Sequence, residues 1–176
     1  MAQTITLPAG KRPAGKIEEG QSQEDRIQEE RRQYALDYAS RFVRQGKVVA
    51  FPTDTFYGLA VDPFNLAAVN ELYELKRREH RKPVLLAVSS VDQAETLTDD
   101  LPLIFYRLAE RFWPGPLTMV LPAAKGLPLR ITGRTGKVAL RLPRCEPAVA
   151  FVTAAGCPLT ATSANLSKMP ECSTAE

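Results

Sequence analysis

Two segments rich in hydroxyl side chains each follow a predicted strand, and both could bind a polar ligand. The first is residues 51–59, Phe-Pro-Thr-Asp-Thr-Phe-Tyr-Gly-Leu, and the second is residues 162–167, Thr-Ser-Ala-Asn-Leu-Ser. In α/β proteins, ligands bind outside the carboxyl ends of the strands, where both segments should lie. Each segment alone is typical of an ordinary turn. Together with nearby cations they predict a site for an anionic ligand.

Basic residues supply those cations. Residues 76–82, Lys-Arg-Arg-Glu-His-Arg-Lys, carry five formal positive charges and one negative charge, and the stretch 111–145 has seven basic residues and no acidic residue. Brought together by the fold, these residues would form a positive concave surface suited to phosphates, nucleotides or RNA. If the fold keeps the two segments apart, residues 76–82 are a solvated helix end and residues 111–145 contain a basic surface loop.

The residue inventory argues against several other kinds of site. The chain has one His and three Cys. His80 lies among cations with only Glu79 as a nearby carboxylate, which is a poor arrangement for a hydrolase triad. The cysteines lack zinc-site spacing, so no metal site is predicted, and Cys145 and Cys157 are expected to be buried, unreactive thiols. Residues 133–138 have too short a glycine spacing for a Walker loop.

The elements that position these segments follow from hydrophobic spacing and turn residues. Helices are predicted at 22–45, from Asn65, from Ser90, at 101–112 and at 147–155, and strands near 48–51, 83–88, 117–121, 138–142 and 158–162. Strands that alternate with helices of about ten residues indicate an α/β fold with an open, twisted sheet of mixed or parallel pairing and flanking helices.

Length and composition fit one soluble domain. The chain has 176 residues and a formal net charge of +3. Residues 1–21 are predicted to be a flexible leader and residues 22–176 the domain. No apolar run approaches the length of a membrane span, and acidic residues near the start argue against a secretory signal or presequence. A cytoplasmic protein without membrane association is expected.

Five ordered motifs resemble the YrdC/TsaC-type threonylcarbamoyl-AMP synthase family. They are residues 51–59, Lys76-Arg77-Arg78 with Lys82-Pro83, residues 113–118 (Trp-Pro-Gly-Pro-Leu-Thr), residues 138–143, and Ser163-Ala164-Asn165. The resemblance runs from about residue 25 to the last residue. It implies a YrdC-like open sheet with a basic concave face.

The resemblance also implies an activity, that of an L-threonylcarbamoyladenylate synthase. Such a nucleotidyltransferase forms threonylcarbamoyl-AMP and pyrophosphate from L-threonine, bicarbonate and ATP, with Mg²⁺ accompanying ATP and no tightly bound cofactor. The product would pass to the tRNA threonylcarbamoyl-transferase machinery, and binding of tRNA or double-stranded RNA is a further implication.

By the same resemblance, individual residues acquire expected roles. Lys76 and Arg78 would hold phosphates and bicarbonate, and Lys82 would be a further phosphate contact. Thr53 and Arg141 would bind L-threonine, with Arg141 clamping its carboxylate through two hydrogen bonds. The nucleotide and carbamate oxygens would bond to Thr118, Ser163 and Asn165.

The sequence also allows other interpretations of Arg78 and of the function of the chain. Arg78 could pair with Glu74 on one helix face. The chain could be a catalytically incomplete module that binds nucleotide or double-stranded RNA, or the related domain of hydrogenase-maturation carbamoyltransferases. Glu79 and Lys168 stand where the family commonly has proline and glycine. The family also continues beyond residue 176, so a domain truncated at its C-terminus is expected.

Overall fold

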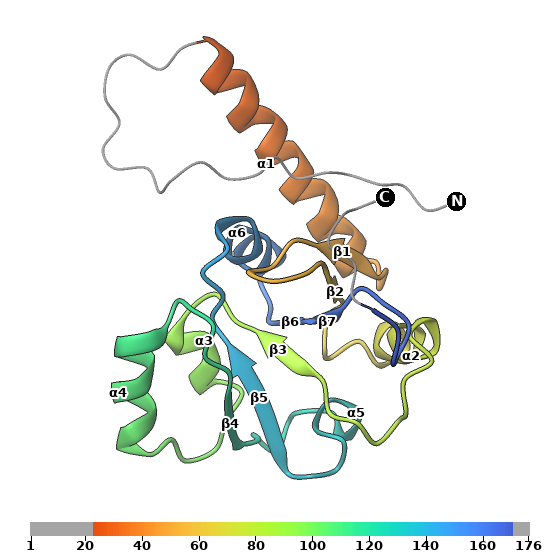
Figure 1. Cartoon of the computed structure of the whole chain (residues 1–176), viewed down its shortest axis with the longest axis vertical. Helices are drawn as coiled ribbons and strands as arrows, with labels where there is room; N and C mark the ends of the chain where they lie inside the picture. The colour runs from red at the N-terminus through yellow and green to blue at the C-terminus, as the bar shows by residue number, and fades with distance from the viewer. Residues whose placement is uncertain (1–22, 171–176) are drawn as a thin grey trace.

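The computed structural model describes residues 23–170, which form two open β-sheets with helices packed around them (Figure 1). The predicted leader at 1–21 lies outside the described residues. The helices are α1 (Gln23–Arg44), α2 (Leu66–Leu75), α3 (Val91–Glu95), α4 (Leu103–Phe112), α5 (Leu129–Thr132) and α6 (Glu146–Ala155). The strands are β1 (Val49–Phe51), β2 (Gly58–Ala60), β3 (Leu85–Ala87), β4 (Met119–Pro122), β5 (Lys137–Arg141), β6 (Leu159–Thr160) and β7 (Thr162–Ser163).

Local sequence signals account for most of these boundaries. The Asn65 side chain accepts a hydrogen bond of 3.1 Å from the backbone N–H of Ala68 and so caps α2, as predicted. Ser90 caps α3 in the same way. Helix α6 ends at Gly156, whose φ of 74° lies in the left-handed region that favours glycine. The predicted helices and strands are therefore confirmed, with ends that shift by one or two residues.

The seven strands divide into two sheets. Strands β1, β2 and β7 form an antiparallel sheet in the order β1-β2-β7, and the other four form a sheet in the order β4-β5-β3-β6. In the second sheet, β3 and β5 are parallel and the remaining pairs are antiparallel. The α/β class and the mixed pairing are confirmed. The division into two sheets differs from the single sheet that was expected.

That division occurs within the last predicted strand, at residues 158–162. Its first part, β6, pairs with β3, and its second part, β7, pairs with β2. Thr160, which is fully buried, joins the sheets directly: the Val61 N–H donates to its Oγ1 at 2.9 Å, and its own N–H donates to the Val61 carbonyl at 3.0 Å. One continuous segment therefore belongs to both sheets.

Two hydrophobic cores lie on either side of this crossing. The larger core packs α2 and α4 against the inner face of the four-stranded sheet, with Leu72, Phe105 and Leu140 among its buried side chains. The smaller core joins α1, α6 and β1, and includes Val43 and Phe151. Figure 1 shows the N-terminal part of α1 extending beyond the body of the molecule. Within residues 23–170, no helix combines the length and apolar character needed to cross a bilayer.

The Thr160 connection generates a stability prediction. Replacing Thr160 with Val keeps the side-chain volume but removes the acceptor for the buried Val61 N–H. An unsatisfied buried donor costs about 1–3 kcal/mol, so the free energy of unfolding measured in urea should fall by that amount. Thr153→Val is the matched control, because its exposed hydroxyl bonds only within α6. We expect the control to change stability by about 0.5 kcal/mol or less; equal losses in both variants would contradict the assignment.

Candidate functional site

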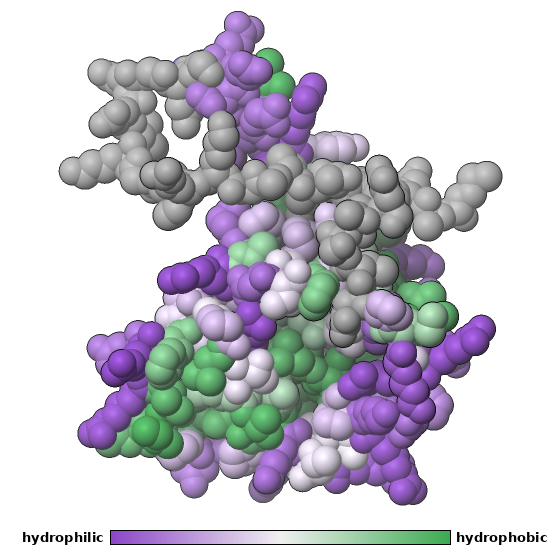
Figure 2. Space-filling model, viewed as in Figure 1, coloured by the Kyte–Doolittle hydropathy of each residue, from purple (hydrophilic) through white to green (hydrophobic). Residues whose placement is uncertain are grey.

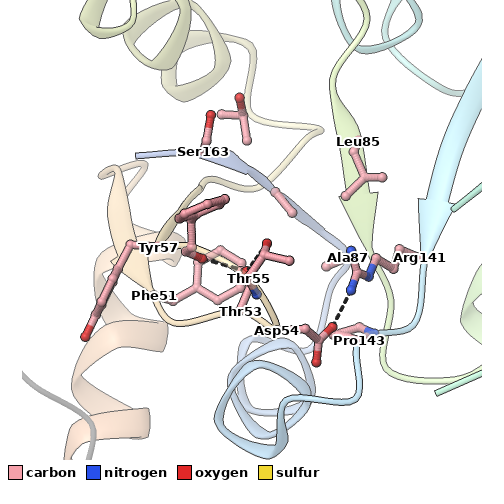
Figure 3. Close-up of a pocket in the computed structure, with 14 residues that line it drawn as sticks. Phe51, Thr53, Asp54, Thr55, Tyr57, Leu85, Ala87, Arg141, Pro143 and Ser163 are labelled. Atoms are coloured by element: carbon pink, nitrogen blue, oxygen red, sulfur yellow. Dashed lines mark hydrogen bonds and ion pairs between the residues drawn. The ribbon is translucent and has the colours of Figure 1, made fainter. Parts of the chain in front are cut away.

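A cavity of about 150 Å³ lies between the two sheets (Figure 3). The carboxyl ends of β1, β3 and β5 open onto it, together with β7 and the loop between β1 and β2. Its lining residues are Phe51, Thr53, Asp54, Thr55, Phe56, Tyr57, Gly58, Leu85, Ala87, Arg141, Pro143, Ala161, Thr162 and Ser163. The two hydroxyl-rich segments of the sequence thus meet at one cavity.

The loop between β1 and β2 is shaped by its own hydroxyls. The Thr53 hydroxyl donates to the Phe56 carbonyl at 2.6 Å and accepts from the Thr55 N–H at 3.3 Å. This pattern fixes a tight turn and places Thr53 and Thr55 along the cavity wall. The close approach of the Phe51 ring requires a glycine at residue 58. A Cβ there would lie 3.0 Å from the ring, so a larger residue would displace the ring or the loop.

Arg141, at the end of β5, faces Asp54 across the mouth of the cavity (Figure 3). Its Nη2 lies 2.5 Å from Asp54 Oδ2, and its Nε donates to the Gly115 carbonyl at 3.1 Å. The Asp54 carboxylate also accepts from the N–H groups of Cys145, at 2.6 Å, and Arg144, at 3.4 Å. Asp54, which had no predicted role, thus joins the loop between β1 and β2 to β5 and to the backbone before α6.

Lys76, the first residue after α2, is 2% exposed and points into the loop that follows β7. Its Nζ donates to the Ser163 carbonyl, to the Asn165 carbonyl at 2.7 Å and to Asn165 Oδ1 at 3.1 Å. The Ser163 hydroxyl donates to the same Asn165 Oδ1 at 2.6 Å. In this structure Lys76 therefore supports the 163–165 loop from beneath, and Ser163 lines the cavity.

The remaining predicted residues lie outside the cavity lining. Arg78 donates to the Pro83 carbonyl at 2.7 Å, which differs from the alternative pairing with Glu74. Lys82 pairs with Glu79 at 2.9 Å on the surface. This pairing holds the pKa of the Glu79 carboxyl below its usual value.

Thr118 is exposed and also lies outside the cavity lining. It precedes Met119, which pairs with Leu140, so it lies near Arg141 in the strand register. The structure thus brings together Thr53, Arg141 and Ser163 at the cavity, with Lys76 and Asn165 behind Ser163.

The predicted basic concave face does not describe this cavity. Among the described residues that line it, Arg141 is the cation and Asp54 the acid, while Leu85, Ala87 and Pro143 make the floor apolar. Figure 2 shows hydrophobic surface across the lower part of the view, bordered by hydrophilic side chains on both sides. Alternation along β5 turns Leu140 into the core and Arg141 to the opposite face, where it lines the cavity.

Lys168 preserves the loop geometry that the family's glycine would give. Its φ is 74°, in the left-handed region where glycine has no steric cost, which accounts for a glycine at this position. The neighbouring Ser167 N–H still donates to the Lys76 carbonyl at 2.9 Å. The departure at Lys168 therefore leaves the support of the 163–165 loop in place.

The two thiols of the described region are less reactive than an ordinary cysteine. Burial raises the pKa of Cys145 and raises that of Cys157 to about 11. Both thiols are free and partly buried. The expectation of unreactive thiols is thus supported by the pKa directions, although neither side chain is fully buried. Within residues 23–170, no group of three or more His, Cys, Asp or Glu side chains is placed to hold a metal ion.

Two open sheets that enclose hydroxyls and a guanidinium define an α/β domain suited to a small polar ligand. Residues 41–176 match the Sua5/YciO/YrdC family model, described as telomere recombination. The chain belongs to this family.

Its relatives include the threonylcarbamoyl-AMP synthase of Pyrococcus abyssi, which is 40% identical over 138 residues, 78% of this chain and 41% of the relative. The synthase of Escherichia coli K12 is 36% identical over 144 residues, 81% of this chain and 76% of that protein.

Solved structures agree with this assignment. Pyrococcus abyssi Sua5 complexed with L-threonine matches with a TM-score of 0.79 and 39% identity, over 81% of this chain and 42% of that one. Escherichia coli YciO matches with a TM-score of 0.70 at 24% identity, over 78% of this chain and 66% of that one, which supports the fold alone. The chain spans about two fifths of the length of the synthases from Pyrococcus abyssi and Bacillus subtilis.

The buried position of Lys76 leads to a stability prediction. Lys76→Met keeps an aliphatic side chain but removes the donor that holds three oxygens of the 163–165 loop. Because hydrogen bonds from charged groups contribute about 1.5–3 kcal/mol, the free energy of unfolding in urea should fall by about 2–3 kcal/mol. The control is Lys82→Met, whose ammonium is exposed and should change stability by about 0.5 kcal/mol or less. A Lys76→Met variant as stable as the control would show that the loop does not depend on this ammonium.

The raised thiol pKa leads to a reactivity prediction. With a pKa of about 11, roughly one Cys157 thiol in a thousand is ionised at pH 8. Since the thiolate is the nucleophile, iodoacetamide should label Cys157 far more slowly in the native protein than in urea. The rate should rise steadily as the pH increases toward 11. Peptide mass spectrometry measures both rates; equal labelling in the native and unfolded chains would contradict the pKa.

Proposed function

We propose that the chain is an L-threonylcarbamoyladenylate synthase, which forms threonylcarbamoyl-AMP and pyrophosphate from L-threonine, bicarbonate and ATP. The observation that carries the proposal is the cavity itself, which is lined by Arg141 together with Thr53, Thr55, Thr162 and Ser163. Relatives named threonylcarbamoyl-AMP synthase support this reading over that of an inactive binding module. So does the likeness to a relative solved with L-threonine.

L-Threonine is the substrate that the cavity suits best. A volume of about 150 Å³ accommodates a small amino acid. The planar guanidinium of Arg141 would bind the α-carboxylate, because its N–H groups match the two carboxylate oxygens. Hydroxyls on the opposite wall would bond to the threonine side chain, and the apolar floor formed by Leu85 and Ala87 would contact its methyl group.

ATP would lie next to the same cavity, along the segments that surround Lys76. In the proposal, Arg78 and Lys82 approach the phosphates from the surface, and Thr118 and Asn165 bond to nucleotide oxygens. Lys76 would act on the same ligands partly through Ser163 and Asn165, which it holds in place. Mg²⁺ would arrive bound to the triphosphate as part of the substrate.

The chemistry requires little beyond placing the reactants and offsetting their charges. The threonine nitrogen bonds to the carbon of bicarbonate with loss of water, and an oxygen of the resulting carbamate displaces pyrophosphate at the α-phosphorus of ATP. All three reactants carry negative groups, so fixed cations in a partly dry cavity lower the repulsion between them. Holding the amine against the carbonate carbon would supply a further large part of the acceleration.

The product would serve tRNA modification. A threonylcarbamoyl adenylate is an activated acyl phosphate, which a transferase can pass to a tRNA base. We therefore place the reaction in the cytoplasm, upstream of the tRNA threonylcarbamoyl-transferase machinery.

Pyrophosphate release tests the proposal. The chain is incubated with ATP, Mg²⁺, bicarbonate and L-threonine, and each component is omitted in turn. Release should require all of them, and mass spectrometry should detect threonylcarbamoyl-AMP. Release that does not depend on threonine, or none from a folded chain, would contradict the assignment. RNA binding that weakens steeply with salt, without pyrophosphate release, would instead favour a binding module.

A further inference from the structure

Asp54 connects three parts of the cavity that are distant in sequence. It lies in the loop between β1 and β2 and bonds to Arg141 at the end of β5 and to the backbone just before α6. We propose that Asp54 is a positioning residue, which fixes the Arg141 guanidinium at the cavity and thereby sets the affinity for a ligand carboxylate. This inference rests on the proposed function of Arg141 as the carboxylate clamp.

The contacts of Arg141 show how the guanidinium is fixed. A long arginine side chain has many rotamers, and ordering it on ligand binding would cost conformational entropy. Here Nε is held by the Gly115 carbonyl at 3.1 Å and Nη2 by Asp54 at 2.5 Å. Two contacts on one planar group fix its plane, while the second N–H of Nη2 and the parallel N–H of Nη1 can meet the two oxygens of a carboxylate. The entropic cost is thus met on folding and not on binding.

The contacts of Asp54 show why it can act as a fixed anchor. Its other oxygen, Oδ1, accepts from the Cys145 N–H at 2.6 Å, and the Arg144 N–H lies 3.4 Å from Oδ2. These backbone groups precede α6, whose N-terminus favours a negative charge. The side chain is only 18% exposed, so little water competes for it. The anchor therefore does not depend on Arg141 alone and would remain in place while Arg141 binds a ligand.

The charge pattern explains why an acid is required here. Without Asp54, no acidic residue among the described lining residues would balance the charge of Arg141. The guanidinium could then turn toward anions in solvent or toward phosphates. An amide at residue 54 can still accept from the Cys145 N–H, but it attracts the guanidinium far less. Asp54→Asn therefore separates the positioning of Arg141 from the shape of the loop.

The experiment compares Asp54→Asn with Asp54→Glu and with a matched control, Asp62→Asn. Asp62 also accepts from a backbone N–H in a loop, that of Phe64 at 2.9 Å, but it does not line the cavity. The first measurement is the nitrogen-15 NMR signal of the Arg141 Nη2 group, which contacts Asp54, in the ligand-free chain, assigned with Arg141→Lys. Wild type and Asp62→Asn should show a sharp, slowly exchanging signal, which Asp54→Asn should broaden or lose.

The second measurement is steady-state pyrophosphate release. Asp54→Asn should raise KM for L-threonine at least tenfold, with KM for ATP within about twofold of wild type. Asp54→Glu, which keeps the charge, should restore part of the threonine affinity, and Asp62→Asn should match wild type. Should Asp54→Asn fail to fold, as judged by thermal melting, Asp54→Glu takes its place in both measurements, with smaller changes in the same direction.

The outcomes separate this inference from the proposed function. An Arg141 signal that is the same in wild type and in the folded Asp54 variant overturns the positioning role, as does an equal rise in KM for threonine and ATP. A wild-type chain that releases no pyrophosphate overturns the proposed function instead. In that case the NMR comparison alone decides whether Asp54 fixes Arg141.

Discussion

The hydrogen bonds between Thr160 and Val61 join the two sheets at the point where one chain segment passes from β6 to β7, and this crossing sets the relative position of the cavity walls. Since β6 and β7 are separated by one residue, the chain leaves the four-stranded sheet and enters the three-stranded sheet without a loop. The carboxyl ends of β1, β3 and β5 are thereby brought to the same edge. An open sheet offers a ligand one surface, whereas two sheets joined at an angle offer opposing walls. The cavity is a consequence of this crossing.

Among the described residues that line the cavity, one guanidinium paired with one carboxylate carries the charge. Arg141 and Asp54 have opposite formal charges and side chains 19% and 18% exposed, so their interaction is screened less than one on the open surface. The exposed cations Arg77, Arg81 and Lys82 lie outside the lining, where salt weakens their effect on an approaching anion.

Most of the elements could be predicted because their signals are local, whereas the short β2 and α5 were not predicted. Caps such as Asn65 and Ser90 act within three residues, and strand patterns within five. The two sheets could not be predicted, since nothing in residues 158–162 distinguishes one strand from two half-strands with different partners. The site was predicted only in part for the same reason. Thr53, Arg141 and Ser163 carry side chains that suggest their chemistry, whereas the importance of Asp54 depends on a partner 87 residues away. The sequence offered one indication of the role of Asp54, namely that it is an acidic residue within a hydroxyl-rich loop.

Lys76 and Asp54 each attach one wall of the cavity to the rest of the fold. Neither the 52–57 loop nor the 163–167 loop is held chiefly by strand pairing. One is anchored by a carboxylate that accepts from β5 and the start of α6, and the other by an ammonium that donates to loop carbonyls. Each anchor is a charged group that makes hydrogen bonds to complementary groups. These bonds fix the direction of the side chain and do not depend on apolar packing in the two cores. Loosening either anchor would open one wall of the cavity while both cores stay packed, and such local freedom is what a site that must admit and release several ligands requires.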